Sequence, residues 1–241
     1  MSHSIGLPPV AHLGSEALKA RVIPPVPAGE KISALAVTEP SGGSDVANLR
    51  TTARRDGDHY VLNGQKTFIT SGMRADFITC AVRTGGEGMG GISIVVVPGD
   101  APGLARTPLD KMGWWCSDTA TLYFDECRVP KENLIGREGM GFIVTMRTFD
   151  YTRPGVAAQA LGIAGGAFEY ALNYAHTRRQ FGKPISSFQA VNHMLADMAT
   201  QIEAARALIY STAQMIDAGK AKNISKLSAM CKLLASDTAM K

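Results

Sequence analysis

The first half of the chain carries short apolar runs separated by turn residues, a pattern typical of β-strands. An apolar run from Ile32 to Val37 opens this region, and Pro130 closes it. Asp56-Gly57 and Asn63-Gly64 both match dipeptides that favour tight hairpin turns. Further strands are expected at 66–70, 76–82, 92–97 and 120–127. Short strands joined by short turns predict an antiparallel sandwich or barrel.

Helical signals lie on both sides of this β region. Ser15 is a good N-cap for a short helix, which Pro24-Pro25 should end. A long helix is expected from about Gly141. Pro154 lies inside it and should kink or break it, because proline has no backbone N–H to donate.

The last quarter of the chain has the apolar spacing of a helical bundle. From Phe188 to Ile209 apolar residues recur at alternating steps of three and four. Gly219 is placed to end that helix, and Asn223 can cap the next one. This last helix reaches Lys241 without a stop signal, so we expect the chain to be part of a longer protein.

These patterns predict an α+β multidomain fold. Residues 1–30 are expected to be the remnant of an N-terminal helical domain. Residues 31–130 should form a middle antiparallel β-sandwich or barrel. Residues 131–241 should form the first part of a C-terminal antiparallel α-helical bundle.

Composition excludes several function classes. A net charge of +4, with no run of five basic residues, argues against nucleic acid as a partner. Four cysteines lack C-x-x-C spacing, so neither a zinc site nor a disulfide framework is expected, and a reducing compartment is the default. Apolar runs such as Ile92–Val97 fall far short of the roughly 20 residues that a membrane span needs.

One segment looks built for a ligand. The strand ending at Val37 runs into Thr38, a proline and two glycines, and then Ser44 and Asp45. Glycines allow close approach of the backbone to a ligand, and successive N–H groups in such a turn suit anionic oxygens. The alternative interpretation is a tight surface turn between strands.

A second glycine pattern is a false lead. Gly86-x-Gly88-x-x-Gly91 matches the dinucleotide-binding fingerprint, but an apolar strand follows it where a helix is required. We interpret Gly85–Gly91 as a hairpin loop.

Several motifs occur in a characteristic order. Thr-Glu-Pro-x-x-Gly-Ser-Asp is followed by Lys66–Gly72, Lys111–Thr119, Arg178–Ile185 and Leu195–Met198. The series resembles the flavin-dependent acyl-CoA dehydrogenase family, nearest its medium-chain-type members, over essentially the whole chain. The resemblance implies an N-terminal helical domain, a middle β domain and a C-terminal helical domain, of which the first and last are incomplete here.

The resemblance implies FAD as the cofactor. Residues near the first motif would line it, with Thr38 at the isoalloxazine and the Thr70 hydroxyl near flavin N5. The implied lining residues are Leu35, Val37, Thr38, Gly43 and Ser44, with Phe68, Ile69 and Thr70 closing one face. The family usually has tryptophan at the position of Phe68 and often asparagine at that of Ser71. From the residues alone, 68–70 is an ordinary alternating strand.

A basic segment near the start of the bundle is a second candidate. By resemblance Arg178, Phe181 and Gln189 hold the phosphates and adenine of a flavin in the neighbouring subunit, which implies a homo-oligomer, usually a tetramer. Arginine suits bidentate phosphate contacts, and a phenyl ring offers a stacking face. The alternative is a basic helix C-terminus followed by a Gly-Pro turn.

A third candidate concerns the substrate. Asp150 and Arg153 are three residues apart on one helix and therefore face the same way. By resemblance both contact the CoA portion of an acyl-CoA, and Ser44 is shared between flavin and substrate. The alternative is a surface ion pair, contributing a few tenths of a kcal/mol.

The implied reaction is α,β-dehydrogenation of a fatty acyl-CoA to the trans-2-enoyl-CoA, with electrons passed to an electron-transfer flavoprotein. The bacterial cytoplasm or the mitochondrial matrix is the expected location. A carboxylate must remove the α proton. The family places it two residues after the position of Asp150, where this chain has Thr152, or in a segment beyond Lys241. We therefore assign no catalytic residue, and we interpret Glu39 and Asp118 as structural.

Two alternatives remain open. The same scaffold can carry a flavin-dependent acyl-CoA oxidase or monooxygenase, because function resides in the site. The chain can also be a truncated relative that binds flavin or CoA without catalysis.

Overall fold

The computed structural model describes residues 5–219 and 224–241, so the predicted cap Asn223 lies outside the described residues. The chain divides into two compact units, Met1–Thr148 and Phe149–Lys241. We call them the β unit and the helical unit and describe each by itself. The domain bounds 1–30, 31–130 and 131–241 stay predictions.

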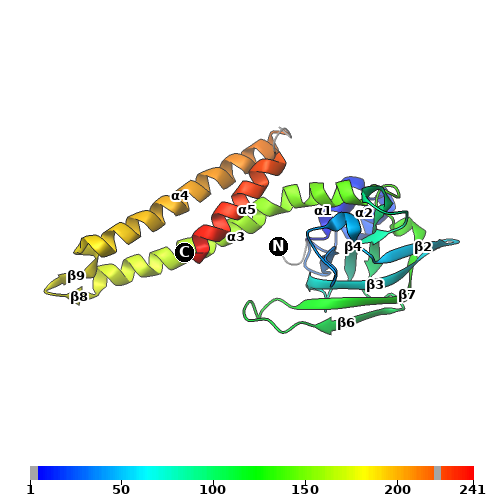
Figure 1. The fold of residues 1–241 in the computed structure, drawn as a ribbon, viewed down its shortest axis with the longest axis horizontal. Helices are drawn as coiled ribbons and strands as arrows, with labels where there is room; N and C mark the ends of the chain where they lie inside the picture. The colour runs from blue at the N-terminus through cyan, green and yellow to red at the C-terminus, as the bar shows by residue number, and fades with distance from the viewer. Residues whose placement is uncertain (1–4, 220–223) are drawn as a thin grey trace. The chain divides into compact units, whose positions relative to one another are not determined.

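The β unit is built on one curled seven-stranded sheet (Figure 1). The strand order is β1-β4-β2-β3-β7-β6, with β5 paired to β4. The strands are β1 (Ser33–Ala36), β2 (Thr52–Asp56), β3 (His59–Thr70), β4 (Phe77–Arg83), β5 (Ile92–Pro98), β6 (Leu104–Pro108) and β7 (Thr119–Pro130). The predicted α+β fold class is confirmed. One expectation needs correction: β1 runs parallel to β4, and β2 meets β4 in parallel at one residue pair.

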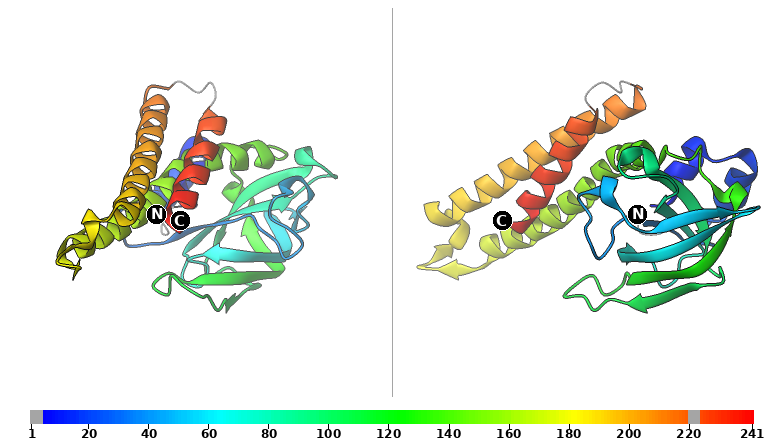
Figure 2. Two further views of the ribbon diagram at one scale, coloured as in Figure 1. Left: turned by 60° about the vertical axis from the view of Figure 1, so that its left-hand side comes forward. Right: turned by 45° about the vertical axis from the view of Figure 1, so that its right-hand side comes forward.

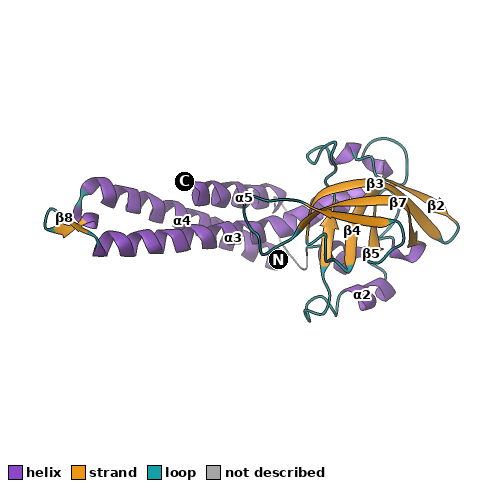
Figure 3. Ribbon diagram, turned by 90° about the horizontal axis from the view of Figure 1, so that it is seen from below, coloured by secondary structure: helices purple, strands orange, loops and turns teal. Residues whose placement is uncertain are grey.

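The core of the sheet follows from alternation along its strands. Inward-facing residues such as Leu62, Ile78 and Leu122 are fully buried in one cluster. The strand β5 is buried along its length because two short helices, α1 (Leu7–Leu13) and α2 (Glu16–Val22), cover its other face (Figure 3). Ile94 and Val96 pack there against the helices.

The predicted N-cap of α2 is confirmed. The Ser15 hydroxyl accepts a hydrogen bond of 3.2 Å from the Leu18 N–H. The helix α1 was not predicted from the sequence. It begins with prolines in its first turn, where the missing N–H groups have no intrahelical acceptor in any case.

The hairpin predicted at Asp56-Gly57 is present between β2 and β3, whereas the one predicted at Asn63-Gly64 is wrong. The strand β3 runs through that position with a β-bulge opposite β7. The Asn63 side chain holds the bulge, because its Oδ1 accepts from the Glu126 N–H at 2.9 Å and its Nδ2 donates to Glu126 Oε1 at 2.7 Å. Gly64 has φ of 142°, and a Cβ there would lie 2.7 Å from Thr51 Cα.

The loop predicted at Gly85–Gly91 holds a single 3₁₀ turn and leads directly into β5. No βαβ unit surrounds this part of the described chain, so the glycines of Gly86-x-Gly88-x-x-Gly91 do not form the dinucleotide-binding fingerprint that their spacing matches. The 3₁₀ turns among the described residues are η1 (Val46–Asn48), η2 (Met89–Gly91), η3 (Lys131–Asn133) and η4 (Ile185–Ser187).

The helical unit consists of most of α3 (Gly141–Thr177), a hairpin of β8 (Arg179–Gln180) and β9 (Lys183–Pro184), α4 (Gln189–Asp217) and α5 (Ile224–Met240). The helix α3 does not end at Pro154, so it does not break there, and the alternative expectation of a kink stays a prediction. Ala157, Ile202 and Cys231, one from each helix, are buried in a common cluster. Figure 2 shows α4 and α5 side by side.

The predicted apolar seam of α4 is only partly buried. Ile202, Ala205 and Ile209 are buried, whereas Met198 is 39% exposed. In α5 the buried residues are Ile224, Ser228, Cys231 and Ala235. Gly219 follows α4 with φ of 67°, as predicted. Over the described residues, no helix has the length and apolarity to cross a membrane.

Candidate functional site

The turn after β1 is closed by its own backbone. The Glu39 N–H donates to the Gly42 carbonyl at 3.1 Å, and the Gly42 N–H donates to the Glu39 carbonyl at 3.0 Å. A Cβ at Gly43 would lie 3.0 Å from Thr38 Cγ2, so glycine permits this close approach. Gly43 and Ser44 are exposed, and Thr38 is half-buried. The turn therefore presents backbone and hydroxyl groups at the surface.

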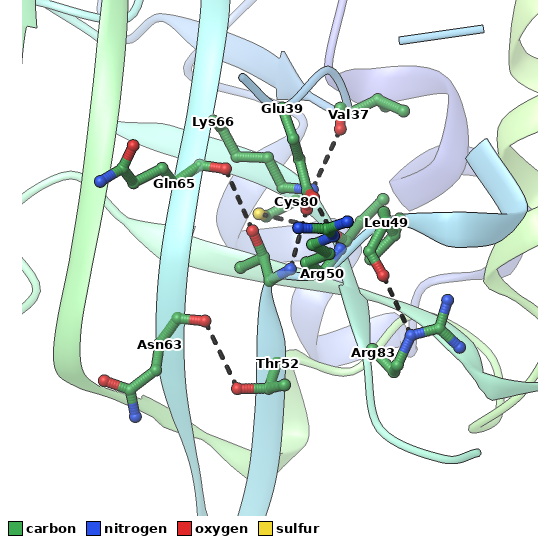
Figure 4. A network of polar contacts seen from close by, with 12 residues as sticks. Val37, Glu39, Leu49, Arg50, Thr52, Asn63, Gln65, Lys66, Cys80 and Arg83 are labelled. Atoms are coloured by element: carbon green, nitrogen blue, oxygen red, sulfur yellow. Dashed lines mark hydrogen bonds and ion pairs between the residues drawn. The ribbon is translucent and has the colours of Figure 1, made fainter. Parts of the chain in front are cut away.

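The carboxylate of Glu39 fixes the far end of this turn. Its Oε2 accepts from the Arg50 N–H at 2.6 Å, and its Oε1 accepts from the Thr51 N–H at 2.9 Å. The ammonium of Lys66 donates to the same Oε1 at 2.8 Å (Figure 4). Glu39 is thus engaged on both oxygens, which agrees with a structural role.

Lys66 reaches this turn from strand β3. Its side chain is fully buried, and its Nζ also donates to the Val37 carbonyl at 3.0 Å (Figure 4). Burial alone would raise the pKa of Glu39, but the charge of Lys66 and the hydrogen bonds to the carboxylate outweigh it and lower the pKa. Glu39 is therefore an ionised group at neutral pH.

Strand β3 departs from regular geometry beside this ion pair. The Thr67 N–H donates to the Thr38 carbonyl at 2.9 Å, which joins the strand to the turn. The register with β7 shifts between Lys66 and Ile69. Phe68 lies in this bulge with φ of 59°, and 70% of it is exposed. A bulky residue at positive φ is uncommon, and such strain is concentrated at functional sites.

The remaining predicted lining residues lie on the same elements. Leu35 is half-buried on β1, at the end of which Val37 is buried. Ile69 is buried, and Thr70 is half-buried at the end of β3. The structure thus places these residues on β1, the turn that follows it, and the bulged end of β3.

The loop after β3 is held by Asp118. Its backbone carbonyl accepts from the Ser71 N–H at 2.9 Å, and its Oδ2 accepts from the Met73 N–H at 2.8 Å. Its Oδ1 pairs with Arg74 Nε at 2.7 Å. Asp118 is therefore a structural group, as the sequence analysis expects.

The donor set beside the bulge fits a flavin. Hydroxyl groups of Thr38 and Thr70 suit the hydrogen-bonding edge of an isoalloxazine, and an exposed phenyl ring suits its flat face. Two of the cysteines are inert thiols, since burial raises the pKa of Cys80 to about 12 and that of Cys127 to about 11. Across residues 5–219 and 224–241, no cluster of side chains has the composition of a metal site.

In the helical unit, Asp150 and Arg153 form the expected pair. Arg153 Nη1 lies 3.3 Å from Asp150 Oδ1, and the guanidinium lies 5.5 Å from the centre of the Phe149 ring. The second carboxylate oxygen of Asp150 accepts from Ser225 Oγ at 2.5 Å. Both residues are partly exposed. The pair keeps accessible polar surface while α5 fixes one side of it.

The other three predicted residues lie at the β8–β9 hairpin. Arg178 precedes the hairpin and Gln189 follows it, and both are exposed. Phe181 is 92% exposed with φ of 53°, and its ring meets that of Phe188 edge-on with centres 6.1 Å apart. Lys183 Nζ lies 4.4 Å from the centre of the Phe188 ring. The hairpin therefore carries cationic and aromatic groups at an exposed tip.

Sequence reasoning missed Lys66 as a member of the site. Its strand alternates, and a lysine in such a strand is normally assigned to the solvent face, because lysine is rarely fully buried without a partner. One signal in the sequence could have indicated a partner for Lys66, namely the opposite charge of Glu39 in the turn motif. No local pattern links these two residues, however.

Comparison with known proteins identifies the family. The middle-domain model of acyl-CoA dehydrogenases matches residues 34–127, and the C-terminal-domain model matches residues 139–241. Cyclohexane-1-carbonyl-CoA dehydrogenase from Geobacter metallireducens is 45% identical over 98% of this chain and 62% of its own length.

Solved structures agree. A probable acyl-CoA dehydrogenase from Mycobacterium abscessus is 47% identical with a TM-score of 0.92, over 97% of this chain and 62% of that one. A chain from the structure described as the electron transferring flavoprotein of Acidaminococcus fermentans is 46% identical with a TM-score of 0.94, over 99% and 63%. The chain thus spans about three fifths of the length of the relatives it matches. It belongs to the acyl-CoA dehydrogenase family.

Proposed function

We propose that this chain supplies the flavin-binding and CoA-binding surfaces for α,β-dehydrogenation of a fatty acyl-CoA to the trans-2-enoyl-CoA. The observation that carries the proposal is the strained, exposed Phe68 beside the turn that bears Thr38. A hydrogen bond of 2.9 Å from the Thr67 N–H to the Thr38 carbonyl connects the two. Family membership supports FAD as the cofactor.

In this proposal the turn and the bulge would both line the flavin. Bound FAD would supply the hydride acceptor. The Thr38 and Thr70 hydroxyls orient its ring, and the Phe68 ring covers one face and excludes water. The proposed lining residues are Leu35, Val37, Thr38, Gly43, Ser44, Phe68, Ile69 and Thr70.

The proposed substrate-binding residues are Ser44, Asp150 and Arg153. Ser44 would contact the substrate as well as the flavin, and Asp150 and Arg153 would contact the CoA portion. The Arg153 guanidinium is well suited to this, because it pairs with Asp150 on one edge and keeps further N–H donors for an anionic group.

We further propose a homo-oligomer, as a tetramer, in which Arg178, Phe181 and Gln189 complete a flavin site in a neighbouring subunit. The exposure of all three at the β8–β9 hairpin supports this role. An electron-transfer flavoprotein is the proposed electron acceptor, in keeping with the Acidaminococcus relative. The proposed location is the bacterial cytoplasm or the mitochondrial matrix.

The general base is proposed to lie outside residues 1–241. Thr152 cannot serve as a carboxylate base. Glu39 and Asp118 each use both carboxylate oxygens for structural contacts, which supports excluding them.

The absorption spectrum of the purified chain tests the proposal, before and after adding octanoyl-CoA. We expect a bound-flavin band that octanoyl-CoA shifts without rapid bleaching. Rapid bleaching would place the base within residues 1–241. Absence of flavin binding at saturating FAD would contradict the proposal.

The oxidase alternative is separated by a second measurement. When the flavin in the protein is reduced chemically, a dehydrogenase should pass electrons quickly to an electron-transfer flavoprotein and slowly to oxygen. Fast reaction with oxygen would favour an oxidase or monooxygenase on this scaffold.

A further inference from the structure

We propose that Lys66 and Glu39 are positioning residues, which set the flavin-facing turn against strand β3. The inference rests on the proposed function, because it assigns these two side chains a role in the same site. Neither would touch the flavin. They act through Thr38 and through the bulge that carries Phe68.

The contacts of the pair join the segments that carry Val37, Thr38 and Phe68. Lys66 extends from β3, one residue before the hydrogen bond between Thr67 and Thr38. Its Nζ donates to the Val37 carbonyl at 3.0 Å and to Glu39 Oε1 at 2.8 Å. Glu39 in turn accepts from the backbone N–H groups of Arg50 and Thr51. One buried cluster therefore ties the end of β1, the turn and the segment before β2 to β3.

A second lysine–carboxylate pair at the other end of β1 provides a comparison. Lys31 and Asp76 also meet at 2.8 Å, and Asp76 also accepts from a backbone N–H, that of Ile32. Their side chains are 48% and 31% exposed, whereas those of Lys66 and Glu39 are 0% and 4% exposed. The two pairs share chemistry and differ in burial.

If the pair of Lys66 and Glu39 served stability alone, its nearly complete burial would be unusual. Desolvation of two charges can cost as much as their attraction returns, and apolar side chains of similar volume are often as stable. Charged partners add a fixed hydrogen-bond geometry, which apolar packing does not provide. A site that must hold Thr38 and Phe68 at a set separation needs this fixed hydrogen-bond geometry.

The Val37 carbonyl provides a second way in which Lys66 can affect flavin binding. The peptide unit that contains this carbonyl also contains the Thr38 N–H. A hydrogen bond from a cation to the carbonyl polarises the unit and makes the N–H a stronger donor. Lys66 thus orients Thr38 and strengthens its backbone donor.

The test compares Lys66→Met with Lys31→Met in the purified chain. Methionine keeps the apolar stem and removes the charge in both cases. The first measurement is amide hydrogen exchange without flavin at Arg50, Thr51 and Thr67. We expect faster exchange at all three in Lys66→Met and unchanged exchange in Lys31→Met. Unchanged exchange in Lys66→Met would overturn the inference.

The second measurement is the dissociation constant for FAD, together with the visible circular dichroism of the bound flavin. We expect Lys66→Met to weaken binding about 10-fold or more and to alter the dichroism, with Lys31→Met unchanged. Faster exchange with unaltered flavin binding would overturn the positioning role. A wild-type chain that binds no FAD contradicts the proposed function instead, and exchange still decides whether the pair sets the turn.

A double variant keeps the test decisive if Lys66→Met does not fold. Lys66→Met with Glu39→Gln leaves no unpaired buried charge and should fold. It should still show fast exchange at Thr67 and weakened FAD binding. Lys66→Arg, which keeps the charge, should recover part of the FAD affinity. Wild-type exchange and affinity in the double variant would overturn the inference.

Discussion

Ser228 Oγ donates a hydrogen bond of 2.7 Å to the backbone carbonyl of Asp150. In a regular helix this carbonyl would accept from the N–H of residue 154, which is a proline here. The buried Ser228 on α5 therefore supplies the donor that Pro154 lacks. This contact helps α3 to continue through a proline that the sequence predicts to kink or break it.

Ser228→Ala should destabilise the helical unit by about 1–3 kcal/mol, because it leaves the part-buried Asp150 carbonyl without this donor. Thermal unfolding measures the loss. Ser236→Ala is the matched control, since Ser236 Oγ donates to the Leu233 carbonyl within its own helix. It should be near neutral. Equal losses in the two variants would show that the carbonyl does not depend on Ser228.

The bulge at Gly64 predicts a steep cost for a side chain there. Gly64→Ala should destabilise the β unit by about 2–4 kcal/mol, because overlap with Thr51 adds to backbone strain. Gly57→Ala is the control: φ is also positive, but a Cβ there meets nothing within 4 Å. Its cost should be about 1 kcal/mol. Denaturant unfolding compares them, and a smaller loss at Gly64 than at Gly57 would argue against the bulge.

Stability should fall in acid through Glu39. Its pKa is lower in the folded chain than the ordinary value of 4.5. The stability that the ionised carboxylate contributes is therefore present above the ordinary value and is lost as the pH falls through the folded-state pKa. Glu39→Gln should cost about 3–5 kcal/mol at neutral pH by leaving Lys66 unpaired. The difference should shrink in acid.

Unfolding curves across this pH range provide the measurement. Glu16→Gln serves as the control, because it removes an exposed pair with Lys19 and should follow the wild-type curve. A gap between wild type and Glu39→Gln that stays constant into acid would show that the carboxylate of Glu39 does not carry this dependence.

The sequence predicts the elements whose signals are local. The cap at Ser15 and the turn at Asp56-Gly57 are decided by residues within a few positions, and both are confirmed. Asn63-Gly64 has the same local chemistry as a hairpin, yet Glu126, far along the chain, makes it a bulge. The edge strand β6 escaped prediction because its five residues show neither an apolar run nor an alternation of apolar and polar residues.

The features of the site likewise divide into those set by local sequence and those set by long-range contacts. The residues themselves mark the turn bearing Thr38, whereas the segment carrying Phe68 is singled out only by the family resemblance. The sequence does not mark the positive φ of Phe68, because it depends on the register of β3 with β7. Nor does it mark the burial of Lys66, because that depends on the carboxylate of Glu39, 27 residues away. These two features are set by contacts between segments far apart in the sequence, which local patterns do not reveal.

The central claim is that the turn after β1 and the bulge in β3 together hold a flavin. Titration of the purified chain with FAD, followed by visible circular dichroism, tests it most directly. We predict saturable binding that Thr38→Ala and Phe68→Ala each weaken about 10-fold or more. Met89→Ala, at an exposed residue of the same unit outside the site, should leave binding unchanged. Saturable binding that is equally strong in all three variants, or no binding by the wild-type chain, would contradict the claim.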